Sequence, residues 1–210
     1  MKNPESMWKK IITNIFQLLL FLLFVENSFA TVVVSETFSS CPGTPDGWTV
    51  TNHSDGCEWI FDSDRENTTG GEGCFAFANS HDTCESSSVD TSLDTPALDC
   101  STLHGTQLSF SYDGYTESVD TENVFLVQVS VGGGGVWTTV DWQPADTNDL
   151  LGPQAASIDI SSLVDGQSDV RIRFRYTAST PWWWQLDDVK VSSGFQWLLF
   201  MPAIIGRPIP

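Results

Sequence analysis

The 210-residue sequence predicts an all-β domain made of two packed antiparallel sheets. From residue 31 onward, apolar residues do not keep the 3.6-residue spacing of a helix over three turns, whereas alternation of period two recurs along the chain. Segments rich in Gly, Pro and Asp separate the alternating runs. Hydrophobic residues form 40% of the chain and include nine Trp and 13 Phe, which is enough for a packed core despite the net charge of -18.

The clearest predicted strand spans residues 170–176. Four apolar side chains alternate there with three arginines, so one face of the strand belongs to the core and the other to solvent. The apolar residues are Val170, Ile172, Phe174 and Tyr176, and the arginines are Arg171, Arg173 and Arg175. These arginines form either a cationic binding strip or pairs with acids on neighbouring strands, and the excess of acids favours pairing.

A β-hairpin is predicted over residues 122–142, with the glycine run 132–135 as its turn. Its first strand places Phe125, Val127, Val129 and Val131 on one face, and the preceding strand does the same with Leu108, Phe110 and Tyr112. Further strands are expected at 32–38, 47–52, 57–62, 73–79, 154–160 and 183–192. With no helix between them, about ten short strands indicate a sandwich.

Residues 1–30 have the layout of a secretory signal peptide. Lysines precede the apolar run 15–25, and small residues flank Phe29 at a cleavage site after Ala30. We therefore expect a single domain at 31–194, followed by an apolar C-terminal tail at 195–210. That tail is interrupted by Pro202 and is too short to span a bilayer, so it is expected to be a terminal strand or a sorting tail.

Charge and residue types narrow the function classes. Nine basic residues against 27 acidic ones argue against a nucleic-acid partner. Three His residues, without a Gly-x-Ser-x-Gly motif or a paired-carboxylate strand motif, argue against an enzyme. The expected protein is non-catalytic.

Five cysteines follow the signal peptide, and export makes disulfides the default expectation. Five thiols allow at most two bridges, and spacing does not fix their connectivity. We expect Cys74 to pair with Cys84, because the short loop between them can be closed at the end of a strand.

The ordered motifs along 36–192 resemble the cleaved-adhesin family, also described as the choice-of-anchor J domain, which is related to MAM domains. They include Pro-Asp-Gly-Trp at 45–48, Thr-Gly-Gly-Glu-Gly-Cys-Phe-Ala-Phe at 69–77, and Trp-Trp-Trp-Gln-Leu-Asp-Asp-Val at 182–189. The resemblance implies a jelly-roll β-sandwich that is secreted or displayed on a bacterial surface as an adhesion or binding module, often with structural calcium.

In the resembling family, acids after the Phe-Ala strand and in the late Asp-Asp pair are calcium ligands. The resemblance therefore implies a calcium site at Glu36, Asn79, Asp82, Asp187 and Asp188. His81 departs from the family pattern, which reads Ala-Asp-Ser-Asp in this segment. The alternative is that Asp187 and Asp188 bond loop amides or pair with arginine and need no ion.

The cluster of three tryptophans offers Trp182 and Trp184 as ligand-binding residues, because alternation leaves part of such a cluster at the surface. Packing at a sheet edge is the competing interpretation. The predicted function is an extracellular adhesion or recognition module for a glycan or an extracellular protein. A structural component of the envelope or matrix without a ligand is the alternative.

Overall fold

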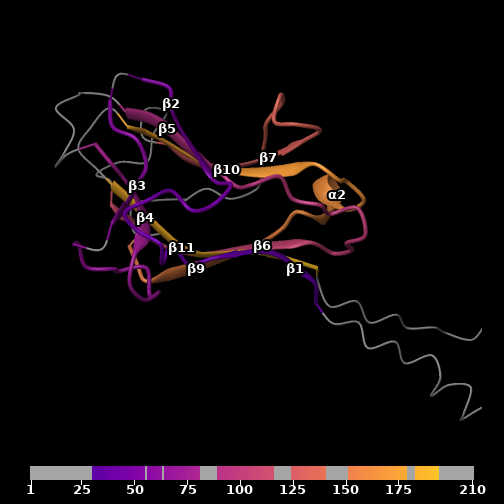
Figure 1. Cartoon of the computed structure of the whole chain (residues 1–210), viewed down its shortest axis with the longest axis horizontal. Helices are drawn as coiled ribbons and strands as arrows, with labels where there is room; N and C mark the ends of the chain where they lie inside the picture. Colours follow the sequence, from indigo (N-terminus) through magenta and orange to yellow (C-terminus); the bar gives the residue numbers. More distant parts are fainter. Residues whose placement is uncertain are drawn as a thin grey trace, which may run out of the picture.

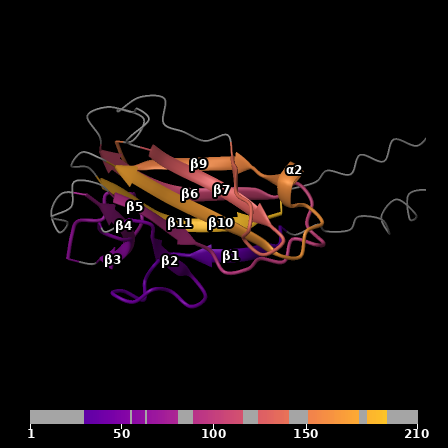
Figure 2. The same cartoon turned by 90° about the horizontal axis from the view of Figure 1, so that it is seen from above.

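The computed structural model describes residues 30–54, 56–62, 64–80, 89–115, 124–140, 151–178 and 183–193. Within this part of the chain two antiparallel sheets face each other in a jelly-roll β-sandwich, as predicted (Figures 1 and 2). The predicted signal peptide, up to residue 29, and the tail at 195–210 lie outside the described residues. No helix in the described ranges is long and apolar enough to cross a bilayer.

The first sheet, called sheet A here, has the order β3-β4-β11-β6-β9, and β1 also pairs with β11. Its strands are β1 (Val32–Glu36), β3 (Ile60–Asp62), β4 (Phe75–Asn79), β6 (Gln107–Tyr115), β9 (Gln154–Asp159) and β11 (Trp183–Ser192). Strand β11 pairs with β4 through its first residues and with β1 through its last, so it holds both ends of the described chain in one sheet.

The second sheet, sheet B, has the order β2-β5-β10-β7-β8. Its strands are β2 (Thr49–Asn52), β5 (Val89–Asp94), β7 (Val124–Val131), β8 (Thr138–Thr139) and β10 (Val170–Ala178). One short helix, α2 (Ser161–Val164), follows β9 and closes one end of the sandwich (Figure 1). The sequence patterns did not predict this helix.

The core lies between the two sheets and follows the predicted alternation. All four apolar residues of the 170–176 segment are fully buried, whereas its three arginines are half-buried. Rings from both sheets meet there: Phe110 and Trp184 of sheet A each contact Phe174 of sheet B, with ring centroids 5.3 and 6.1 Å apart. The aromatic surplus of the sequence therefore forms the layer that joins the sheets.

The predicted hairpin forms, because β7 pairs with β8 across the glycine turn. Of the four residues predicted to share a face, Phe125, Val127 and Val129 are buried and Val131 is 44% exposed. Val131 is the last residue of β7, and the chain leaves the core face there to enter the turn.

The predicted Cys74–Cys84 disulfide is wrong. Cys74 bonds Cys41, 33 residues away, and the bond ties the loop after β1 to the start of β4. Spacing suggested the nearer partner, whereas β4 and the 38–48 loop are neighbours only after folding. Cys57 is also disulfide-bonded, and Cys100 is a free, buried thiol.

Candidate functional site

The three tryptophans point in alternate directions at the start of β11. Trp184 is 0% exposed and contacts Trp59 and Phe125 in the core, so its assignment as a ligand-binding residue is wrong. Trp183 is half-buried on the outer face of sheet A. Trp182 lies outside the described residues. Because successive side chains of a strand face opposite sides, burial of Trp184 puts its neighbour Trp183 at the surface.

Trp183 lies in a groove on the outer face of sheet A. Its ring packs against Phe77 of β4, with centroids 6.3 Å apart, and Tyr115 of β6 is its partner on the other side and is 43% exposed. A cavity of about 310 Å³ lies here. Its lining consists of Arg65, Glu66, Thr68, Phe77, Asp113, Trp183 and Gln185. We call this cavity the Trp183 groove.

The polar side chains of the Trp183 groove are held in place. The Gln185 Oε1 accepts hydrogen bonds from the backbone N and the Oγ1 of Thr68, both at 3.0 Å, and its Nε2 donates to the carbonyl of Glu66 at 3.2 Å. The Arg65 guanidinium lies 4.7 Å from the centroid of the Phe77 ring. Aromatic rings beside fixed donors and acceptors are the composition of a saccharide- or peptide-binding groove.

A second cavity, of about 480 Å³, lies on the other side of Phe77. It is lined by Asn52, Gly56, Cys57, Glu58, Ile60, Phe77 and Asn79. Phe77 is the one aromatic ring among these lining residues, whereas the Trp183 groove is lined by two rings, Phe77 and Trp183. The Trp183 groove therefore offers the larger stacking surface.

Asp187 occupies a buried corner at one end of the same outer face. Its side chain is 0% exposed, its Oδ1 accepts from the backbone N of Asp188 at 2.7 Å, and its Oδ2 accepts from the Nδ2 of Asn67 at 2.8 Å. Burial raises the pKa of Asp187 to about 6, although the hydrogen bond from Asn67 opposes the shift. No arginine or lysine of the described chain pairs with this carboxylate.

Glycine at position 71 allows the loop before β4 to cover Asp187. A Cβ at Gly71 would lie 2.2 Å from the Oδ2 of Asp187, which is too close for any other residue without movement. The loop is thus fixed over the carboxylate by a close backbone approach.

The predicted calcium ligands do not all converge. Trp183 pairs with Asn79 and Leu186 with Ala76, so Asn79 is four register steps, or roughly 13 Å, from Asp187. Glu36 pairs with Val189, two residues from Asp187, and its Oε1 accepts from the backbone N of Phe38 at 2.7 Å. Asp82 lies outside the described residues.

The donor set around Asp187 fits a complete calcium shell only in part. The described residues contain no group of three or more His, Cys, Asp or Glu side chains placed to hold a metal, whereas calcium takes about six to eight oxygens. A buried carboxylate without a basic partner is nevertheless a site where a cation relieves desolvation. Any ion here would use Asp187 and Asp188 with carbonyl or amide oxygens, and not Asn79.

His53 contacts a serine hydroxyl, as in a catalytic Ser-His pair, but this hydroxyl is not accessible to a substrate. The Nε2 of His53 lies 3.0 Å from the Oγ of Ser92, but Ser92 is 0% exposed in strand β5. A buried hydroxyl cannot attack an external substrate. We interpret the pair as structural.

Two of the three arginines on β10 pair with acids of β5, as predicted. Arg173 makes a bidentate pair with Asp94, at 2.7 and 2.8 Å, and Arg175 does so with Asp90, at 2.9 and 2.7 Å. The hydrogen bond from Arg175 lowers the pKa of Asp90 below its ordinary value. The idea of a continuous cationic strip is therefore wrong at these two positions.

Sequence reading missed most of the Trp183 groove. Arg65, Glu66 and Thr68 come from an irregular loop, and Asp113 sits where β6 reads as a simple alternating strand. A usable signal was the alternation in β11 itself, which places Trp183, Gln185 and Asp187 on one face.

Comparison with known proteins supports the fold assignment. No protein-family model matches the chain, and no curated protein matches it. The K1 cleaved adhesin domain of Lys-gingipain from Porphyromonas gingivalis is similar in structure, with a TM-score of 0.52 and 18% identity over 79% of this chain and 99% of that domain. The K3 domain of the same protein gives a TM-score of 0.51 and 16% identity over 79% of this chain and 100% of that domain. The chain has the fold of the cleaved adhesin domains, as its sequence motifs predicted.

Proposed function

We propose that the chain is a secreted or surface-displayed, non-catalytic recognition module that binds a glycan in the Trp183 groove. The observation that carries the proposal is the groove itself, where an accessible Trp183 ring of β11 lies beside Phe77 of β4 and Arg65 of the loop before β4. A flat aromatic face stacks on the C–H face of a sugar ring, and the polar neighbours orient its hydroxyls. The adhesin domains that share the fold are consistent with a binding role.

Secretion follows from the signal-peptide layout of residues 1–30. A bacterial cell surface is part of the same proposal, because it rests on the resemblance to the adhesin family. The acidic surface, at a net charge of -18, supports a partner that is neither nucleic acid nor anionic lipid.

A glycan array probed with the chain tests the proposed function. We expect binding to at least one glycan class, and we expect Trp183→Ala to reduce the affinity tenfold or more while the fold is retained. Val32→Ala is the matched control, because Val32 is an exposed apolar residue of sheet A outside the groove. If the chain binds no glycan on the array but binds a purified extracellular protein, the ligand is a protein and not a glycan. No binding to either class would favour the structural, ligand-free role.

Calcium at the Asp187 corner is a separate part of the proposal. Asp187 supports it, because its buried carboxylate lacks a basic partner in the described chain. A bound cation would stabilise the fold by neutralising that carboxylate. Melting temperatures in excess calcium and in EDTA test the idea, and equal values would reject it.

A further inference from the structure

Arg171 differs from the other two arginines of β10. Arg173 and Arg175 each pair with a carboxylate of β5. Strand β5 ends at Asp94, opposite Arg173, so no residue of β5 lies opposite Arg171. Its partner on the other side is Ser130 of β7. Arg171 therefore makes no ion pair within the described chain.

Three polar atoms lie buried around this arginine without a hydrogen-bond partner. They are the Nε of Arg171, the Oδ1 of Asp169 and the Oγ of Ser130. Ser130 is opposite Arg171, and the carbonyl of Asp169 accepts from the backbone N of Gly132, so all three residues lie at the base of the β7–β8 turn. Buried polar groups in native proteins are almost always paired, and an unpaired group indicates a missing partner such as a water, an ion or a ligand.

The glycine turn lies directly over these atoms. The position of a Cβ at Gly134 is 3.5 Å from the Cδ of Arg171, and that of Gly133 is 3.6 Å from the Oδ2 of Asp169. Gly132 and Gly135 have open space around the same position, so the centre of the turn is the part nearest to Arg171 and Asp169. A turn of glycines, with few packed neighbours, allows a small polar ligand to enter beneath it.

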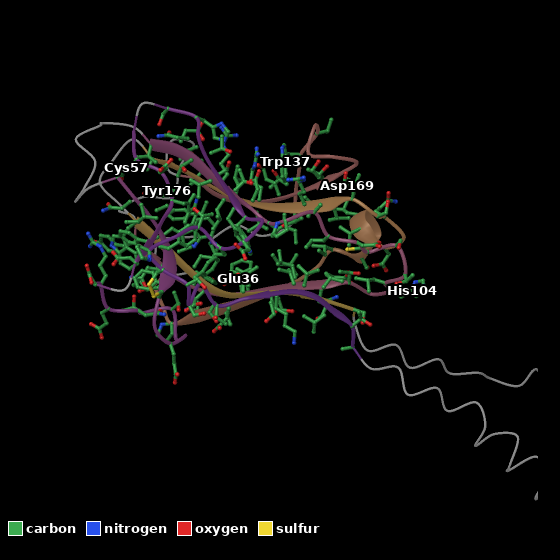
Figure 3. The ribbon with its side chains drawn as sticks, in the orientation of Figure 1. Glu36, Cys57, His104, Trp137, Asp169 and Tyr176 are labelled. Carbon is green, nitrogen blue, oxygen red and sulfur yellow. A yellow bond between two sulfur atoms is a disulfide. The ribbon has the colours of Figure 1, made fainter. Side chains whose placement is uncertain are left out.

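The Trp137 ring provides an apolar surface beside the Arg171 and Asp169 side chains. Its ring is fixed by Arg173, whose guanidinium carbon lies 3.9 Å from the ring centroid, and one ring edge lies 3.9 Å from the Cβ position of Gly134. Figure 3 shows Trp137 and Asp169 on the outer side of sheet B, near the β7–β8 hairpin. The Trp183 groove belongs to sheet A, so the two sites use different sheets.

We propose that Arg171, Asp169, Ser130 and Trp137 form a second binding site, which takes a neutral saccharide. One sugar hydroxyl accepts a hydrogen bond from the Arg171 guanidinium, and a neighbouring hydroxyl donates to the carboxylate of Asp169. Ser130 can donate or accept, and the indole packs against the sugar C–H groups. This inference deepens the proposed glycan-binding function and rests on it.

The charge of the site selects a neutral ligand. A donor-only guanidinium and an acceptor-only carboxylate lie two residues apart on one face, which suits a diol because each hydroxyl both donates and accepts. An anionic sugar would meet the Asp169 carboxylate and the excess negative charge of the chain.

Isothermal titration of the full chain with neutral hexose trisaccharides and with uronic-acid trisaccharides tests the proposal. We expect a neutral trisaccharide to bind, and we expect Arg171→Met, Asp169→Asn and Trp137→Ala each to lower its affinity tenfold or more. Lys190→Met is the matched control, because Lys190 is an exposed basic residue of sheet A. Unchanged affinity in folded Arg171→Met and Asp169→Asn variants would overturn the proposal, as would binding of uronic-acid sugars alone.

Amide NMR of the wild-type chain keeps the test independent of variant folding. Saccharide binding at this site shifts the amide signals of Ser130 and of the glycines at 132–135. Shifts confined to Trp183 and its neighbours would overturn this second site and leave the proposed function standing. If no saccharide binds but a purified protein binds at the Trp183 groove, the second site is again overturned and the recognition function remains. If the chain binds no saccharide and a crystal structure shows waters bonded to the three polar atoms, those atoms are hydrated and the second site is overturned.

Discussion

Arg173 and Asp94 form a bidentate ion pair across strands β10 and β5, with N–O distances of 2.7 and 2.8 Å. The two residues are direct partners in the antiparallel register, and both side chains are largely buried, at 15% and 9% exposure. Arg173 also packs on Trp137, so one guanidinium joins the hairpin to the centre of sheet B. The pair therefore fixes both the register of β5 and the position of the hairpin.

Removal of the Asp94 carboxylate should destabilise the fold strongly. Asp94→Ala leaves the largely buried Arg173 charge without its partner, and we expect a loss of about 2–4 kcal/mol in the free energy of unfolding. Asp90→Ala breaks the equivalent pair with Arg175, whose side chains are 36% and 28% exposed. Water replaces the lost partner there, so we expect a loss below about 1 kcal/mol. Urea unfolding of both variants at pH 7 measures the contrast, and equal losses would contradict it.

The two ion pairs also explain why strand β5 was not predicted from the sequence. Strand β5 reads Val-Asp-Thr-Ser-Leu-Asp, which looks like a polar loop, yet its residues are almost all buried. Asp90 and Asp94 are tolerated because arginines of β10 lie beside them. Alternation is a pattern within one strand and does not identify a partner 79 or 85 residues away. The arginine face of β10 could be predicted because its alternation is local.

The part of the candidate site that could be predicted is the part that depends on side-chain alternation within one strand. Alternation in β11 required Trp183 and Trp184 to face opposite sides, but it could not decide which one is buried. Packing of Trp184 against Trp59 and Phe125, from distant segments, decides it. In the same way, the register of β4 against β11 separates Asn79 from Asp187, although a family motif groups them.

Truncation of the two neighbouring tryptophans should affect different properties: stability for Trp184 and glycan binding for Trp183. Trp184→Ala removes a fully buried indole, and we expect a loss of about 3–5 kcal/mol in the free energy of unfolding. Trp183→Ala removes a half-buried ring at the surface, so we expect a loss of about 1 kcal/mol together with loss of glycan binding. Denaturant unfolding and the glycan array measure the two properties. A severe stability loss in Trp183→Ala would make that residue part of the core.

The Cys41–Cys74 disulfide should contribute to stability and appear in peptide maps. Non-reducing digestion is expected to yield one linked pair of peptides containing Cys41 and Cys74. The bond closes a loop of 33 residues, so Cys41→Ser should lower the free energy of unfolding by about 2–4 kcal/mol. Cys100→Ser is the control, because Cys100 is a free thiol whose loss breaks no bond. Recovery of a peptide that links Cys74 to Cys84 would contradict the assignment.

Asp187 should make the metal-free protein less stable as the pH rises. Burial raises its pKa from 3.8 to about 6, so the folded state holds this proton more tightly than the unfolded state does. The contribution is fully present below about pH 4 and is lost as the pH rises through about 6, for a total of about 2–3 kcal/mol. Asp187→Asn cannot titrate, so we expect the stability difference between wild type and variant, measured in EDTA, to shift against the wild type from pH 4.5 to 7.5. Excess calcium at pH 7.5 should restore the wild type and leave the variant unchanged if a cation binds at this corner. A difference that stays constant with pH would show that the Asp187 carboxylate keeps an ordinary pKa.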